Sequence, residues 1–143
     1  MELKYNDKQR KEYFKTTQKM GLSWISVFED DEEFYSSAYW DLLTNIWVKE
    51  APVRKTDALR FMTNIKSPHT AGKYVETAIA KGILIEEDNP DDARSKLLRL
   101  SPKMRERLDG FFDGCVSDIR KCIGTLDALG PWPKNPWRKR LGL

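Results

Sequence analysis

The sequence is poor in the residues that build metal centres and covalent active sites. Its 143 residues include two cysteines, Cys115 and Cys122, and a single histidine, His69. A zinc site takes about four Cys, His or carboxylate ligands at short, regular spacings, and these residues do not form such a set. A Gly-rich phosphate loop and a nucleophile with an adjacent base are also missing. We therefore expect no metal, no cofactor and no enzymatic activity.

The two cysteines are not spaced for an internal disulfide. They lie seven positions apart in a helical pattern, which separates them by about 10 Å at a rise of ~1.5 Å per residue. A disulfide needs Cα atoms within about 7 Å of each other. We expect two reduced thiols in a reducing cytoplasm, and a redox-sensing pair acting across a dimer is the alternative.

Long apolar runs are absent as well. No stretch approaches the roughly 18 uninterrupted apolar residues of a membrane-spanning helix. Residues 2–8 include four charged side chains, whereas a signal peptide would have an apolar region. We expect one domain without a membrane contact, in the cytoplasm and associated with the nucleoid.

Charge is unevenly spread along the chain. Residues 1–50 hold 7 basic and 10 acidic side chains, residues 51–102 hold 9 and 7, and residues 103–143 hold 9 and 5. The positive excess of the second and third segments fits a surface that contacts nucleic-acid phosphates. Ordinary solvated surface charge is the alternative that the counts leave open.

The middle of the chain predicts three successive helices. Over residues 32–50 the apolar side chains recur with the period of a helix, which ends before Pro52. Thr56 is a good N-cap for a short helix of about two turns. After a polar linker, Ser67 is the N-cap and Pro68 the first residue of the third helix.

The third helix is followed by a hairpin. The residues expected on its buried side follow one another at steps of four, three and four; they are Ala71, Val75, Ala78 and Gly82. Residues 83–85 and 96–100 have the composition of strands and flank a turn-forming stretch at residues 88–94. This order is typical of a winged helix-turn-helix. The fold class that we expect is mainly α, with a small two-stranded β-hairpin and flanking N- and C-terminal helices.

A last long helix is predicted over residues 103–127. Its apolar stripe is longer than one small lobe covers, so we expect a dimer interface, with packing inside a monomer as the alternative. The residues assigned to this interface are Met104, Leu108, Phe111, Phe112, Cys115, Ile119 and Ile123.

The expected single domain, residues 1–143, thus has four parts. They are an N-terminal arm or helix (1–33), the winged helix-turn-helix core (34–102), the dimerisation helix (103–127) and a tail rich in Pro, Trp and basic residues (128–143). Prolines prevent a helix in the tail. Phosphate contacts by its basic residues and disorder are both open; these residues are Lys134, Arg138, Lys139 and Arg140.

Three stretches of the core, residues 56–59, 74–84 and 88–101, carry a resemblance to a known family. They resemble the multiple antibiotic resistance regulator (MarR) family of bacterial winged-helix regulators, whose Asp-x-Arg wing element corresponds to Asp92-Ala93-Arg94. The resemblance implies a wing braced by Asp92 and an Arg94 directed at the minor groove. It also implies a small aromatic effector bound by aromatic residues of the chain, for which packing in the core is the alternative. These are Trp24, Phe28, Trp40, Trp47, Phe111 and Phe112.

Side chains on the polar side of the third helix suit contacts with double-stranded DNA. We assign base reading to His69, Thr70, Lys73 and Thr77, with a flanking or phosphate contact as the alternative for Thr77. We assign backbone contacts to Arg54, Lys55, Lys66, Ser67 and Tyr74, and wing contacts to Asp92, Arg94, Lys96 and Arg99. For the basic residues, plain surface charge is the alternative, and for Arg94 a salt bridge to Asp92 that only shapes the hairpin.

The function that we expect is sequence-specific DNA binding by a transcriptional regulator, as a repressor that acts as a homodimer on a near-palindromic operator. The alternative is a winged-helix module that binds protein and does not bind specific DNA. In that alternative the acidic residues 29–33 and the apolar C-terminal helix would be the contact surfaces.

Overall fold

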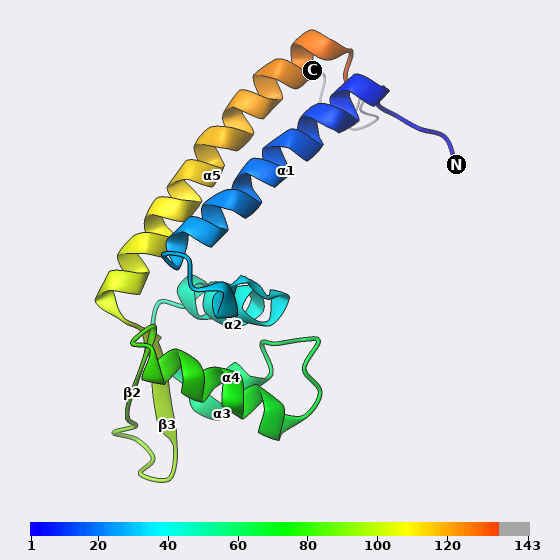
Figure 1. Ribbon diagram of the computed structural model, residues 1–143. Coiled ribbons are helices and arrows are strands. Elements are labelled where there is room, and N and C mark those ends of the chain that lie inside the picture. Colours follow the sequence, from blue (N-terminus) through cyan, green and yellow to red (C-terminus); the bar gives the residue numbers. More distant parts are fainter. Residues whose placement is uncertain (135–143) are drawn as a thin grey trace. The chain divides into compact units, whose positions relative to one another are not determined.

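The computed structural model describes residues 1–134 and is mainly helical, with one small sheet (Figure 1). Its elements are α1 (Asp7–Val27), the 3-10 helix η1 (Glu32–Tyr35), α2 (Ser37–Val48), β1 (Val53–Arg54), α3 (Lys55–Leu59), α4 (Pro68–Ala80), β2 (Leu84–Asp88), β3 (Lys96–Leu100) and α5 (Pro102–Leu129). The expected fold class is confirmed. The two alternatives left open for Arg138, Lys139 and Arg140, phosphate contacts and disorder, concern residues outside the described part of the chain.

Two compact units make up the chain. The terminal unit consists of Met1–Ser23 together with the chain from Phe112 onward, and the central unit is Trp24–Phe111. Both α1 and α5 contribute residues to each unit. None of the helices in the described part of the chain is long and apolar enough to cross a membrane.

The sheet of the central unit has three strands, one more than predicted. The order is β1-β3-β2 and both pairings are antiparallel. β1 is only two residues long, with Val53 opposite Leu98 of β3. A strand this short contains no alternation that a sequence pattern could reveal, and for this reason the prediction contained the β2–β3 hairpin alone.

The helix predicted over residues 32–50 is divided in the structure. Glu29 and Asp30 both have positive φ angles, 51° and 68°, which end the preceding helix in a turn. Asp31 then caps η1, and Ser36 caps α2 by accepting a hydrogen bond from the backbone N–H of Tyr39 at 3.3 Å. The acidic run therefore forms a turn and a 3-10 helix, and α2 starts at Ser37.

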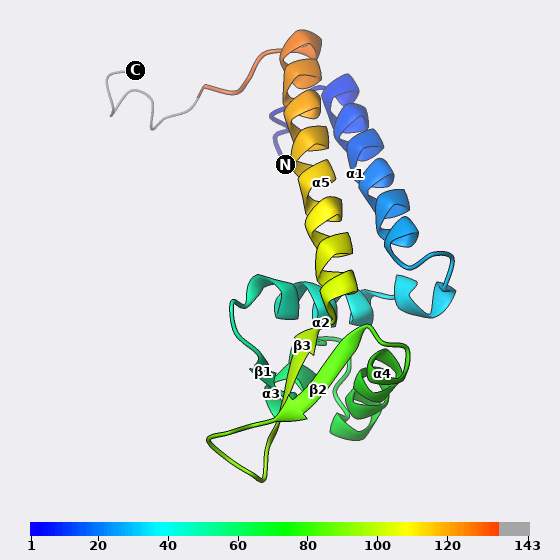
Figure 2. The same cartoon turned by 90° about the vertical axis from the view of Figure 1, so that its left-hand side faces the viewer.

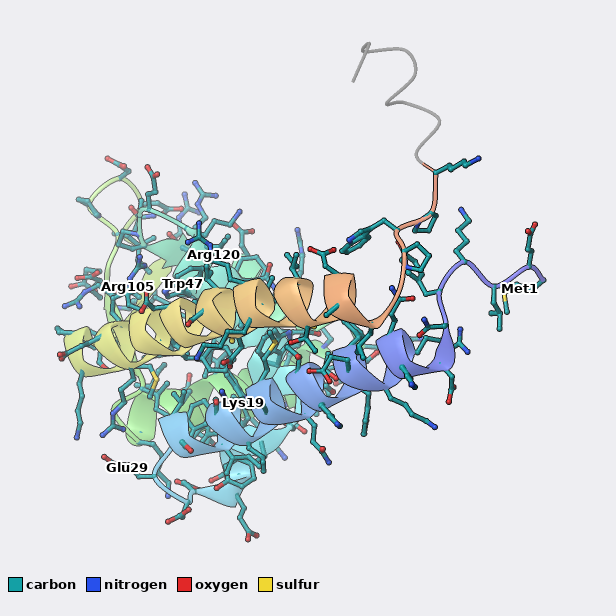
Figure 3. All side chains as sticks on the ribbon, turned by 90° about the horizontal axis from the view of Figure 1, so that it is seen from above. Met1, Lys19, Glu29, Trp47, Arg105 and Arg120 are labelled. Atoms are coloured by element: carbon teal, nitrogen blue, oxygen red, sulfur yellow. The ribbon has the colours of Figure 1, made fainter. Side chains whose placement is uncertain are left out.

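Aromatic and aliphatic side chains fill the core of the central unit. Trp24, Phe28 and Phe111 are buried, with the Trp24 ring 4.9 Å from Phe28 and 5.4 Å from Phe111 between centroids. Further out, the guanidinium of Arg105 lies 5.4 Å from the centroid of the Trp47 ring and donates to its carbonyl oxygen at 3.0 Å (Figure 3). Three of the six aromatic residues, Trp24, Phe28 and Phe111, thus pack in the core, whereas Trp47 and Phe112 are half-buried and Trp40 is exposed.

The terminal unit pairs α1 with the C-terminal part of α5, side by side and antiparallel (Figures 1 and 2). Asn6 and Gln9 form a reciprocal cap at the start of α1, at 3.0 and 2.8 Å. The same two side chains also donate to the carbonyls of Leu129 and Leu126 near the end of α5. One pair of amides therefore satisfies backbone groups at the ends of both helices.

Candidate nucleic-acid interface

α4 is held in the fold by one apolar side and by well-formed ends. Ala71, Val75 and Ala78 are buried, as predicted, but Gly82, the fourth residue of the predicted buried side, is exposed because the helix has already ended there. The Ser67 side chain accepts from the N–H of Thr70 at 3.4 Å, and Pro68 is the first helical residue. Gly82, with φ of 72°, follows the helix in the left-handed conformation that glycine tolerates best. The rotation of α4, and therefore the direction of its outer side, is determined by this packing.

The outer side of α4 presents unoccupied polar groups near the helix N-terminus. His69, Thr70 and Lys73 are exposed, and the side chains of His69 and Lys73 have no hydrogen-bond or ion-pair partner among residues 1–134. They lie along a shallow hollow lined by Pro68, His69, Gly72, Lys73, Glu76 and Thr77. These donors are free to bind an external acceptor.

Two residues assigned to the same interface are engaged with α2. The hydroxyl of Tyr39 donates to the carbonyl oxygen of Tyr74 at 2.9 Å, and the two rings lie 5.1 Å apart. Burial raises the pKa of Tyr39 to about 12, with a smaller opposite contribution from a hydrogen bond with Thr77. Tyr74 and Thr77 are half-buried and couple α4 to α2, so they offer less to a ligand than Lys73 does.

The turn of the wing is braced by its own side chains. The carboxylate of Asp92 accepts from the backbone N–H of Arg94 at 3.0 Å. Asn89, a buried residue that the sequence did not single out, donates to the Ser95 hydroxyl at 2.8 Å and accepts from the N–H of Asp91 at 3.0 Å. The Asn-Pro pair at the start of the turn was the available signal.

The guanidinium of Arg94 is exposed and makes no ion pair with any described residue. The salt bridge to Asp92, the alternative left open above, is therefore absent. The other two basic residues of the hairpin are paired: Lys96 with Asp88, and Arg99 with Glu87 at 3.1 Å. The hydrogen bond from Lys96 lowers the pKa of Asp88. Of the three wing cations, Arg94 alone is available within the described chain.

The basic residues predicted to contact the DNA backbone also divide into unpaired and paired ones. Arg54 and Lys66 are exposed without a partner among residues 1–134, and so is Arg60, which the sequence did not single out. Lys55 instead pairs with Glu76 and Glu86. Thr56 was expected to be the N-cap of α3, but the N-cap in the structure is Arg54, because the helix starts directly after β1. The Arg54 side chain makes no cap hydrogen bond.

The stripe predicted as a dimer interface is only partly at the surface. Met104, Leu108 and Phe111 are buried by residues of their own chain, so they contribute to the core and are not open to a second copy. Phe112 and Cys115 are half-buried. Ile119 and Ile123 are 38% and 46% exposed. Of the residues predicted to form a dimer interface, the exposed ones therefore lie in the part of α5 that belongs to the terminal unit. Cys115 and Cys122, in the same part of α5, are free thiols.

The structure resembles solved transcriptional regulators over most of its length. A transcriptional regulator from Thermotoga maritima gives a TM-score of 0.58 at 19% identity, covering 85% of this chain and 82% of the other. A MarR family transcriptional regulator from Streptomyces coelicolor, solved in complex with DNA, gives 0.51 at 20% identity, covering 92% and 78%. No protein-family model matches the sequence, and no curated protein gives a significant match. The chain thus has the fold of MarR-family regulators.

Proposed function

We propose that this protein is a MarR-like transcriptional regulator that binds double-stranded DNA in a sequence-specific way. The observation that carries the proposal is the outer side of α4, where His69, Thr70 and Lys73 are exposed on a helix whose rotation is determined by packing. A helix of this kind fits the major groove, whose base edges offer acceptors to such donors. Lys73 is the base reader that we expect to matter most.

The unpaired cations support a DNA backbone contact around that helix. Arg54, Lys66 and Arg94 flank α4 in sequence and have no partner in the described chain, so they can exchange counterions for phosphates without breaking an internal pair. Arg94 lies in a turn that is held by hydrogen bonds of the Asp92 and Asn89 side chains. In this proposal the wing places Arg94 in the minor groove next to the site that α4 reads.

A homodimer and a near-palindromic operator complete the proposal. Val116, Ile119 and Ile123 are exposed apolar residues on successive turns of α5, 60%, 38% and 46% exposed. A second copy of the chain would cover such a stripe in a two-fold arrangement, and two α4 helices would then read half-sites about one DNA turn apart. A dimer bound in this way represses by occupying the operator.

The proposal includes a small aromatic effector. Its basis is Trp24, whose indole Nε1 is buried and has no hydrogen-bond partner in the described chain. An aromatic carboxylate bound there would supply the missing acceptor. Titration of benzoate against tryptophan fluorescence tests this part, and saturable quenching that a Trp24→Phe variant loses is the expected result.

Selection from a random pool of DNA duplexes, followed by sequencing, tests the proposed function. We expect the purified protein to enrich a near-palindrome, and its affinity for that duplex to fall steeply with salt. A folded protein that enriches no sequence, with a flat salt response, would contradict DNA binding. It would favour the protein-interaction module, in which the acidic residues 29–33 and the exposed apolar residues of α5 contact a partner.

A further inference from the structure

Lys55 differs from Arg54 and Lys66, the other basic residues assigned to backbone contacts, because its ammonium already pairs with carboxylates of the same chain. Its ammonium pairs with the carboxylates of Glu76 and Glu86, and its side chain is 26% exposed. Burial by itself would lower the pKa of Lys55, but the hydrogen bonds with Glu76 and Glu86 outweigh it and raise the pKa. Lys66, by contrast, is exposed and has no partner within residues 1–134.

The two carboxylates belong to the two elements that a winged-helix protein applies to DNA. Glu76 is on α4 and lines the same hollow as His69 and Lys73. Glu86 is on β2, opposite Leu98 of β3. Lys55 is the first residue of α3. A single ammonium therefore joins the start of α3 to the reading helix and to the first strand of the wing.

We propose that Lys55 is a positioning residue, which holds α4 at a set distance from the wing and does not bind phosphate. The proposal rests on the DNA-binding function proposed above. Lys73 and Arg94 would enter different grooves of one duplex, so both bind together only when helix and wing are correctly spaced. To bind a phosphate, the Lys55 ammonium would have to break its ion pairs with two carboxylates.

The carboxylates provide a test in which positioning and plain electrostatics predict opposite signs. The double variant Glu76→Gln/Glu86→Gln removes two negative charges from the neighbourhood of the DNA, so charge alone predicts tighter binding of every duplex. Positioning predicts that affinity for the selected duplex falls by about tenfold while affinity for random duplexes does not fall. Equal or tighter binding of the selected duplex by the double variant would overturn the proposal.

The salt dependence provides a second test, with Lys66→Met as the matched control. A residue that contacts one phosphate contributes about one unit to the slope of log affinity against log salt. We expect Lys55→Met to weaken binding of the selected duplex about tenfold with an unchanged slope. Lys66→Met should lower the slope and weaken all duplexes alike. A lowered slope in Lys55→Met would make Lys55 a phosphate ligand and overturn the proposal.

A measurement without DNA separates failure of this inference from failure of the proposed function. In ¹⁵N-labelled protein, Lys55→Met should shift the backbone amide resonances of both α4 and β2, and Lys66→Met should leave β2 unchanged. If the wild-type protein selects no duplex, the proposed function fails. The amide shifts still decide whether Lys55 links α4 to β2. Unchanged amides in α4 or in β2 would overturn the inference, whatever the DNA result.

Discussion

The central and terminal units differ in what they bury. In the central unit large apolar side chains such as Phe34, Leu42 and Leu98 are almost completely inaccessible to solvent. In the described part of the terminal unit the buried side chains are Gln9, Thr16 and Cys122. Its large apolar residues lie mostly at the surface; these include Tyr13, Phe14, Leu22, Val116, Ile119 and Ile123.

This difference separates two tasks along the chain. The central unit contains the core needed to hold α4 and the wing in a defined geometry, because burial of apolar area is the main source of stability. The terminal unit exposes large apolar side chains on both of its helices, and exposed apolar side chains that gather on one face mark an interaction site. The proposed DNA contacts belong to the first unit, and the proposed dimer contacts to the second.

The largest expected effect is a core substitution in the central unit. Phe34→Ala removes a fully buried ring and should lower the free energy of unfolding by about 3–5 kcal/mol. Val48→Ala, at an exposed position of the same unit, should change it by less than about 0.5 kcal/mol. Urea unfolding followed by circular dichroism measures both. Similar losses in the two variants would refute the assignment of the core.

The next effect tests the terminal unit as a dimer surface. The double variant Ile119→Glu/Ile123→Glu introduces two charges into the exposed stripe of α5, and should weaken dimerisation by at least about thirtyfold. Val48→Glu, which also places a charge on an exposed apolar position, should leave the dimer intact. Sedimentation equilibrium measures the dissociation constants. The dimer proposal would be wrong if the double variant associated as strongly as the wild type.

A smaller effect contrasts a free cation of the wing with a paired one. Arg94→Ala removes an exposed guanidinium without an internal partner, and should weaken binding of the selected duplex about tenfold and reduce the salt slope by about one. Arg99→Ala removes a guanidinium already paired with Glu87 and should change affinity by less than about threefold. Fluorescence anisotropy at several salt concentrations distinguishes the two. Equal losses would mean that internal pairing does not determine which cations bind DNA.

The smallest effect concerns the hydrogen bond between α2 and α4. Tyr39→Phe removes the donor to the Tyr74 carbonyl and should cost about 1 kcal/mol of stability near neutral pH. Burial raises the pKa of Tyr39 in the folded protein to about 12, from an ordinary value of 10.0.

The sign of the pH effect follows from that pKa. The folded protein holds the Tyr39 proton more tightly than the unfolded chain does, so this contribution is complete below pH 10 and is lost as the pH rises towards 12. Wild-type protein should therefore lose more stability over this range than Tyr39→Phe. Urea unfolding at a series of pH values from 9 to 12 at which both proteins are still folded tests this. Parallel curves of unfolding free energy against pH for the two proteins would contradict it.

The parts of the interface that follow from local rules were predictable from the sequence. Ser67 and Pro68 begin α4 as expected, and the spacing of Ala71, Val75 and Ala78 identifies its buried side. The second strand of the hairpin has its predicted bounds, but β2 is Leu84–Asp88 and continues three residues beyond the predicted strand at 83–85. Capping, helical periodicity and turn preference are all properties of a few neighbouring residues.

The parts that depend on residues far apart in the chain were not predictable. Lys55 was expected to bind phosphate, but its partners are 21 and 31 positions away. The burial of Met104 and Leu108 likewise depends on other elements of the central unit, so a helical stripe could not distinguish core from dimer surface. A basic residue in a sequence does not reveal whether its charge is already paired.

The most direct test of the central claim is duplex selection performed in parallel with the wild type and Lys73→Ala. If the outer side of α4 reads base edges, both proteins should enrich sites with the same half-site spacing, because the dimer is unchanged. The variant should lose its preference at one position in each half-site, where a lost base contact costs about 1–3 kcal/mol. Identical base preferences in the two selections would show that α4 does not read DNA through Lys73 and would contradict the account.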